Sequence, residues 1–206
     1  NMLANIEGQN AQITIGKADA SRLPAEVQTV IGSRPVIQIT LTVDGKQTSW
    51  NNPDAPVIIS VPYTPTAEEL EHLENIIIWY IDGAGNLICV PRGRYDAETG
   101  TVTFTTTHFS DYAVGFNSVQ FNDVAEEAWY YKAVSFIAAR GITNGTGDGN
   151  FSPETNLKRA DFLVLLMRTY EIAPDENPAD NFADAGDTYY RLSGRGKTSW
   201  LSKWCW

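Results

Sequence analysis

The residues best suited to chemistry in this sequence are its two histidines, His72 and His108. His108 lies in the run 107–111, which contains the residue types of a serine hydrolase triad. Side chains along one strand alternate between its faces, so His108, Ser110 and Asp111 are not expected to converge as a triad must. The Gly-x-Ser-x-Gly motif of a nucleophile elbow is also missing from the sequence. We therefore predict no catalytic residues and interpret His108 as a partly buried, hydrogen-bonded residue at the start of a strand.

Metal and phosphate sites are weakly supported. The loop 144–150 offers oxygen donors, but the glutamate that completes a calcium loop is not at the required offset. The run 193–198 resembles a phosphate loop, yet Arg191 replaces its first glycine and no strand precedes it. Cys89 and Cys205 lie far apart in unlike contexts, so neither a disulfide framework nor a metal cluster is expected. We predict no metal and no cofactor.

The charge balance limits the partners. With 25 acidic against 15 basic residues, the formal net charge is -10, which argues against nucleic acid, because that partner requires clustered Lys and Arg. An anionic polymer would have to bind a local basic patch. Hydrophobic residues make up 43% of the chain, enough to bury a core. No membrane span or signal peptide is evident. Because the chain begins in mid-sequence, we interpret it as a fragment, with any secretion signal upstream of it.

The elements that would position these residues fall into two groups, the first of them β-rich. Apolar alternation over 36–43 predicts a half-buried strand, and the run 76–81 predicts a second one. Together with turn-rich connections, the pattern favours an antiparallel sandwich or sheet. The predicted strands are 11–15, 36–43, 56–61, 76–81, 87–90, 101–106 and 111–116, and short helices are expected at 24–30 and 66–73, with Thr66 as N-cap of the latter.

The second group is a helical hairpin over 121–168. Asp123 is predicted to cap a first helix, which ends at Gly141 and has a mostly apolar face comprising Trp129, Ala133, Phe136, Ile137 and Arg140. A glycine- and asparagine-rich loop follows. A second helix is expected over 159–170, with Phe162, Leu165, Leu166 and Tyr170 on one side. Such a hairpin needs copies of itself or a neighbour to bury its faces.

The hairpin resembles the S-layer homology (SLH) repeat of bacterial cell-surface proteins. The run 157–161 stands where the family usually has a Thr-Arg-Ala-Glu type of motif, with Lys158 for Thr and Asp161 for Glu as departures. The segment 52–117 is similar to a β-rich module that often precedes SLH repeats in Gram-positive surface proteins. The matching positions of the repeat are Phe121, Asp123, Val124, Trp129, Val134, Ile137, Gly141, Ile142, Gly145, Asp148, Gly149, Phe151, Pro153 and Leu157–Asp161.

The resemblance implies an α+β fold with an N-terminal antiparallel β-sandwich-like domain followed by a small α-helical SLH repeat. The predicted organisation is a β-rich module at 1–117, one complete repeat at 118–170, a linker and the start of a second repeat at 171–190, and an aberrant tail at 191–206. Phe182 to Ala185 repeat the Phe-x-Asp-Val opening seen at Phe121. The tail permits an out-of-frame interpretation as SLH-like sequence, with vector-derived sequence as the alternative.

The function implied by the resemblance is non-catalytic anchoring at the extracellular cell surface, by non-covalent binding of a pyruvylated secondary cell-wall polysaccharide. Family repeats act in threes, so with one whole repeat this chain is expected to have an incomplete binding groove. A guanidinium fork suits an anionic sugar, and the motif position points to Arg159. Trp129 would stack on sugar or, alternatively, pack between the helices; Lys158 would add charge, and Asp161 would hold Arg159.

Two other function classes remain open on the sequence alone. One is a small hydrolase, an esterase or glycosidase, from a cloned environmental fragment. The other is a carbohydrate-binding or adhesive module in which the β-rich part recognises the ligand. We also expect the exposed helix faces, together with Trp200, Trp204 and Trp206 of the tail, to be covered within the chain or in a homodimer.

Overall fold

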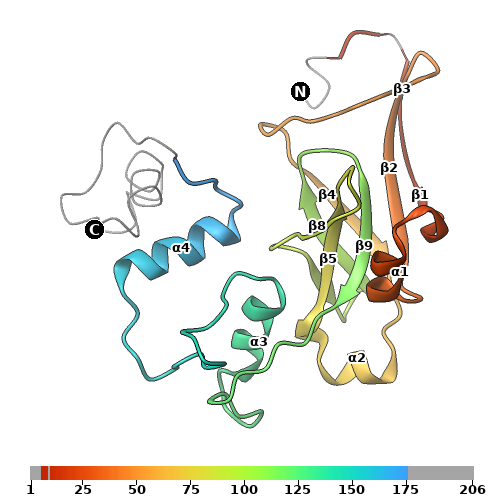
Figure 1. The fold of residues 1–206 in the computed structure, drawn as a ribbon. Coiled ribbons are helices and arrows are strands. Elements are labelled where there is room, and N and C mark those ends of the chain that lie inside the picture. The colour runs from red at the N-terminus through yellow and green to blue at the C-terminus, as the bar shows by residue number, and fades with distance from the viewer. Residues whose placement is uncertain (1–5, 9, 176–206) are drawn as a thin grey trace. The chain divides into compact units, whose positions relative to one another are not determined.

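The computed structural model describes residues 6–8 and 10–175 (Figure 1). The chain divides into two compact units. Of these described residues, those up to Val119, together with Lys132–Arg140, form the first, which we call the β unit. Gln120–Tyr131 and the described residues from Gly141 onward form the second, which we call the C-terminal unit. The predicted tail at 191–206 and the predicted start of a second repeat at Phe182 lie outside the described residues.

The β unit contains two antiparallel sheets. The larger has the strand order β1-β2-β9-β5-β6, with β3 also paired to β2, and the smaller has the order β4-β8-β7 (Figure 1). The strands are β1 (Ala11–Lys17), β2 (Val36–Val43), β3 (Lys46–Thr48), β4 (Val57–Pro62), β5 (Ile76–Ile81), β6 (Leu87–Cys89), β7 (Arg94–Asp96), β8 (Thr101–Thr106) and β9 (Asp111–Phe116). All seven predicted strands are confirmed, as is the α+β class; β3 and β7, three residues each, were not predicted.

One hydrophobic core lies between the two sheets. It is built from alternate residues of β2, β5 and β9 on one side and of β4 and β8 on the other. This alternation explains the predicted half-buried pattern of β2, since inward-facing residues are apolar and outward-facing ones polar. The buried members are Ile37, Ile39, Ile59, Ile76, Ile78, Val90, Val102, Phe104, Tyr112 and Val114.

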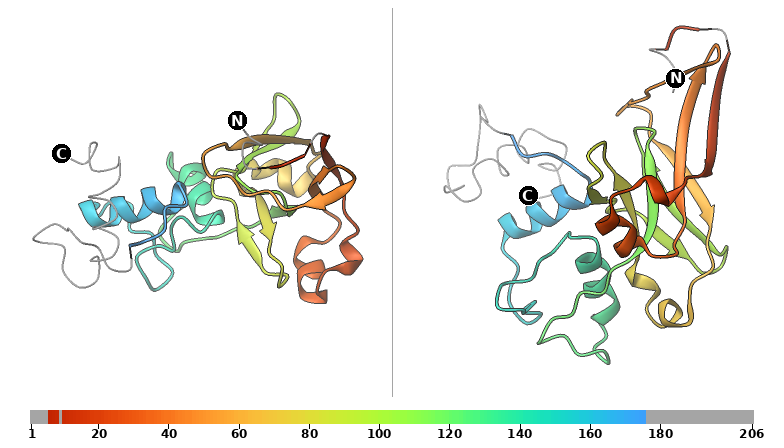
Figure 2. Two further views of the ribbon diagram at one scale, coloured as in Figure 1. Left: turned by 90° about the horizontal axis from the view of Figure 1, so that it is seen from above. Right: turned by 45° about the vertical axis from the view of Figure 1, so that its right-hand side comes forward.

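The opposite face of the larger sheet is covered as well. Ile77, Trp79 and Ile81 of β5 belong to a second core cluster, together with residues of helix α1 (Ala25–Ile31) and with Ala139. Helix α1 lies against β9 (Figure 2). Strand β5 is thus buried on both faces, which is why its sequence is an unbroken apolar run. Gly115 makes room for the Trp79 ring, since a Cβ there would lie 2.4 Å from it.

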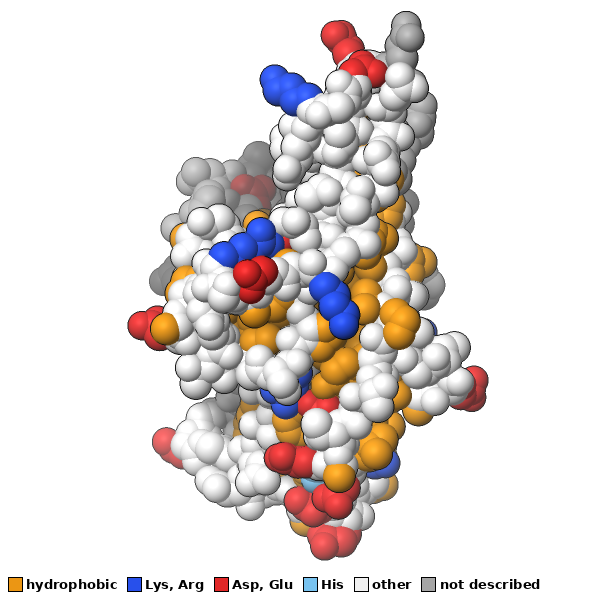
Figure 3. Space-filling model, turned by 90° about the vertical axis from the view of Figure 1, so that its right-hand side faces the viewer, with side chains coloured by type: hydrophobic (Ala, Val, Ile, Leu, Met, Phe, Trp, Pro, Cys, Tyr) orange, Lys and Arg blue, Asp and Glu red, His pale blue; other side chains and the backbone are white. Residues whose placement is uncertain are grey.

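The edge strand β1 is less protected. All seven of its residues are exposed, including Ile13 and Ile15 at 41% and 53%. Figure 3 looks onto the side of the molecule that carries β1 in Figure 1 and shows hydrophobic side chains at the surface. In register, these two residues lie opposite Leu41 and Ile39, both of which are buried. The apolar side of β1 therefore extends beyond the part of the larger sheet that the core covers.

Short helices complete the β unit. Two are 3-10 helices, Ala20–Arg22 and Leu73–Asn75. Helix α2 (Ala67–Glu71) has the predicted N-cap: the Thr66 side chain accepts from the Glu69 N–H, and the Glu69 carboxylate accepts from the Thr66 N–H. Helix α3 (Tyr131–Ala139) belongs to this unit from Lys132 on. Gly141 follows it with a φ of +66°, as expected for a helix terminator.

In the C-terminal unit, helix α4 (Arg159–Thr169) confirms the second helix of the hairpin. Its buried residues are Leu163 and Met167, which pack with Leu166 and Ile172. The predicted apolar face was partly wrong, because Phe162 and Tyr170 are 45% and 44% exposed. Helical spacing alone could not determine which of two adjacent apolar stripes would be buried.

Candidate functional site

Trp129 lies just before α3 and is 93% exposed. Its ring meets the Tyr130 ring edge-on, with centroids 5.4 Å apart. The alternative that Trp129 packs between the two helices is therefore wrong for this structure. An indole that presents its faces to solvent is suited to stacking on a sugar ring or on another flat apolar surface.

Three of the four predicted ligand residues lie at the start of α4. Lys158 is the N-cap residue and makes no side-chain capping hydrogen bond, while Arg159 is the first helical residue. Both are exposed, and Asp161 is partly buried in the first turn. The positive end of the helix dipole adds to the charges of Lys158 and Arg159, so this end of α4 favours an anion. Asp161 lies in the same first turn as Arg159.

Residues at the start of the SLH motif hold the loop between the helices by hydrogen bonds. The Asp123 carboxylate accepts hydrogen bonds from the backbone N–H groups of Phe151 (2.8 Å) and Ser152 (2.7 Å). Both hydrogen bonds lower the pKa of the Asp123 carboxyl, and the bond from Phe151 has the larger effect. The prediction that Asp123 caps the first helix was wrong, since α3 begins only at Tyr131. From sequence alone, an aspartate that caps a helix cannot be distinguished from one that binds a following loop, because either can lie a few residues before a helical pattern.

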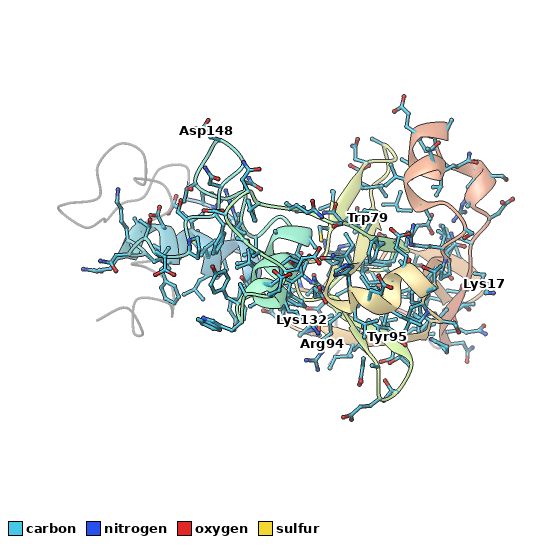
Figure 4. All side chains as sticks on the ribbon, turned by 90° about the horizontal axis from the view of Figure 1, so that it is seen from below. Lys17, Trp79, Arg94, Tyr95, Lys132 and Asp148 are labelled. Carbon is cyan, nitrogen blue, oxygen red and sulfur yellow. The ribbon has the colours of Figure 1, made fainter. Side chains whose placement is uncertain are left out.

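Asn122 and Gly145 complete this arrangement. Asn122 donates from its backbone to Gly149 O and from its side chain to Asp148 O. Asp148 stands at the outward tip of the loop (Figure 4). Gly145 has a φ of +77°, and a Cβ there would lie 2.2 Å from Asn150 O and 2.6 Å from the Phe121 ring. The Phe and Gly positions of the motif thus serve the packing of the loop.

His108 does contact a serine, which was not predicted from the sequence. Its Nδ1 lies 3.2 Å from Ser110 Oγ and 3.2 Å from the Tyr112 hydroxyl, although His108 and Ser110 both precede β9. Asp111 instead pairs with Arg22 at 2.7 Å. Burial lowers the pKa of His108, in keeping with the predicted partly buried, hydrogen-bonded residue. The acid of a triad is not part of this arrangement.

Two features are absent from the described residues. Among them, no group of three or more His, Cys, Asp or Glu side chains is placed to hold a metal ion. None of the helices in residues 6–8 and 10–175 is long and apolar enough to cross a membrane.

Comparison with known proteins identifies the class to which this hairpin and loop belong. The family model of the S-layer homology domain matches residues 120–163, which include α3, the loop and the start of α4. The chain is 32% identical over 117 residues to an amylopullulanase of Thermoanaerobacterium thermosulfurigenes, covering 56% of this chain and 6% of that protein. It is also 34% identical over 67 residues to a surface-layer 125 kDa protein of Lysinibacillus sphaericus, covering 32% of this chain and 6% of that protein.

A third relative is cell surface glycoprotein 1 of Acetivibrio thermocellus, 27% identical over 78 residues, with coverage of 37% of this chain and 3% of that protein. The chain thus spans less than a tenth of the length of these relatives. No solved structure matches it significantly. Residues 120–163 are therefore identified as an S-layer homology domain. Two of the relatives are named as a surface-layer protein and a cell surface glycoprotein.

Proposed function

We propose that this chain anchors a surface protein by binding an anionic, pyruvylated cell-wall polysaccharide at the start of α4, without catalysis. Arg159 donates a forked hydrogen bond to the ketal carboxylate, Lys158 adds positive charge, and Asp161 holds Arg159 in position. Trp129 provides a stacking surface for a sugar ring. We retain as predictions the domain boundaries at 117/118, 170/171 and 190/191. The covering of exposed helix faces by a homodimer or by the tail is also a prediction.

The single observation that carries this proposal is the 93% exposure of Trp129. Apart from its edge-on contact with Tyr130, this indole at a motif position is open to solvent, so its face is available to stack on a sugar ring. The cationic start of α4 supports an anionic ligand in a chain whose net charge of -10 would otherwise repel one.

The test is co-sedimentation with purified bacterial cell walls, using a version of the chain that carries three intact repeats. Arg159→Ala is expected to weaken binding by about 1.5–3 kcal/mol, the value of a charged hydrogen bond. Arg168→Ala is the matched control, because Arg168 is also an exposed arginine of α4 and donates to the Ile142 carbonyl. It should bind like the parent.

Walls from which the pyruvyl ketal has been removed provide the second arm. The parent should bind these walls less tightly, and Arg159→Ala should bind both kinds of wall equally weakly. If Arg159→Ala binds intact walls as the parent does, Arg159 is not part of the site. If removal of the ketal changes nothing, the ligand is another feature of the wall.

A further inference from the structure

Arg140, which directly follows α3, is the most buried charged residue of the SLH domain. Its side chain is 3% exposed, and its guanidinium makes five hydrogen bonds, every one of them to a backbone carbonyl. Nε and Nη2 both donate to Gly93 O, at 2.9 and 2.7 Å. Nη1 donates to Glu74 O at 2.7 Å and Nη2 donates to Ile76 O at 2.9 Å. The fifth bond runs from Nη1 to the carbonyl of Phe136 in the preceding helix α3.

Burial lowers the pKa of Arg140 to about 10, so the group stays charged at neutral pH. Its charge is balanced by carbonyl dipoles and by the face of the Phe136 ring, whose centroid lies 3.5 Å from Cζ. The planar fork suits this role, since it reaches three separate carbonyls of the β unit at once. A lysine has one compact donor group and could not span them.

The end of α3 is also part of the hydrophobic packing of the β unit. Ala139 is 2% exposed and belongs to the core cluster that includes Trp79 of β5 and Ile31 of α1. The Asn117 side chain donates to Ala139 O at 2.7 Å and so satisfies one of the carbonyls left open at the helix end. Apolar packing, a side-chain cap and the Arg140 fork thus act at the same helix terminus.

We propose that the β unit is the docking partner of the first SLH helix and serves as the N-terminal cap of the SLH assembly, with Arg140 as the residue that fastens α3 to it. Repeat assemblies need such caps, because a terminal repeat has a neighbour on one side only. The SLH match at 120–163 cuts across the two compact units, with α3 in the β unit and α4 in the other. This proposal concerns folding and does not depend on the polysaccharide site.

Amide hydrogen exchange on the full chain tests the proposal directly. In the parent, the hydrogen-bonded amides of α3 should exchange as slowly as those of β5, and at least about tenfold more slowly than those of α4, because elements of one cooperative unit open together. Arg140→Ala should accelerate exchange in α3 about tenfold or more and leave α4 unchanged. Arg140→Lys should give a similar change, since charge without the fork is insufficient.

Arg168→Ala is the matched control and should leave α3 unaltered, since Arg168 makes its carbonyl hydrogen bond to Ile142 in the C-terminal unit. Exchange of α3 at the rate of α4 in the parent would overturn the proposal, as would unaltered α3 exchange in Arg140→Lys. If Arg140→Ala does not fold, the parent and Arg140→Lys measurements still decide.

Discussion

Arg34 donates from Nε to Oε1 of Glu69 at 2.7 Å, and this ion pair joins residues 35 positions apart in the β unit. Glu69 is 1% exposed, and its other oxygen accepts from the Tyr63 hydroxyl at 2.7 Å and from the Thr66 N–H at 2.9 Å. Both carboxylate oxygens are therefore satisfied away from water. Burial, and then the hydrogen bond to Glu69, raise the pKa of Tyr63 to about 12.

Glu69→Ala should therefore destabilise the β unit strongly. Removal of one partner of a buried pair leaves Arg34 and the Tyr63 hydroxyl uncompensated, which costs about 3 kcal/mol. Glu71→Ala is the control, because Glu71 lies in the same helix and is exposed. Its effect should stay within about 0.5 kcal/mol. Urea unfolding measures both, and equal midpoints for the two variants would contradict the expected role of Glu69.

The Glu69 carboxylate also makes the stability of the β unit depend on pH. Burial alone would raise the pKa of Glu69, but the hydrogen bonds from Tyr63, Thr66 and Arg34 outweigh it, so the pKa lies below the ordinary value of 4.5. The unfolded state then takes up a proton before the folded state does. The contribution of the Glu69 carboxylate to stability is complete above pH 4.5 and is lost as the pH falls through the lowered pKa.

Thermal unfolding between pH 7 and pH 3 checks this, with Glu69→Gln as the comparison. The parent should lose more stability than the variant over the acid range, because the variant has no carboxylate to protonate at that position. Parallel curves would show that other carboxylates account for the acid loss.

A matched pair of tryptophans separates packing from recognition. Trp79→Ala should cost about 3–5 kcal/mol, because the ring is 9% exposed and lies in a core cluster. Trp129→Ala should change the free energy of unfolding by less than about 0.5 kcal/mol, because its ring is 93% exposed. Chemical denaturation followed by circular dichroism distinguishes them. A large loss in Trp129→Ala would mean that the ring is covered in solution.

Gly145→Ala should damage the loop more than Gly141→Ala. Both glycines have positive φ, but only at Gly145 would a Cβ collide with the backbone, 2.2 Å from Asn150 O. We expect a cost of about 1–3 kcal/mol at Gly145 and about 1 kcal/mol at Gly141, where no atom lies within 4 Å of an added Cβ. Hydrogen exchange of Phe151 and Ser152, whose amides bind Asp123, reports the difference locally. Equal exchange in both variants would rule out the collision.

Local signals explain what was predictable. The alternation of β2, the turn before β6 and the capping pair at Thr66 and Glu69 each involve neighbours in sequence, so a short stretch contains the full pattern. The SLH motif was predictable for a related reason, since its glycines and aromatic residues must satisfy one tightly packed loop. At the candidate site, the start of α4 was found from sequence, whereas the exposure of Trp129 was not.

The remaining features depend on pairings over long separations. Asp123 reaches Phe151 across 28 positions, and Arg140 reaches Glu74 across 66. The sequence near Arg140 shows only an arginine at the end of an amphipathic helix, and such a residue is usually solvated. Its burial follows from carbonyls that two other segments present, and these cannot be inferred from residue types.

The separation between Arg140 and its acceptors also sets an order of events during synthesis. Gly93, Ile76 and Glu74 precede Arg140 by 47, 64 and 66 residues, so the nine strands within the described residues leave the ribosome before this arginine does. Contacts across such lengths form slowly, because a long segment must be closed for each of them. The nascent sandwich would therefore assemble with its three carbonyls still hydrated, and arrival of α3 would complete it. Chains arrested shortly before residue 140 should be more sensitive to protease than chains released after it.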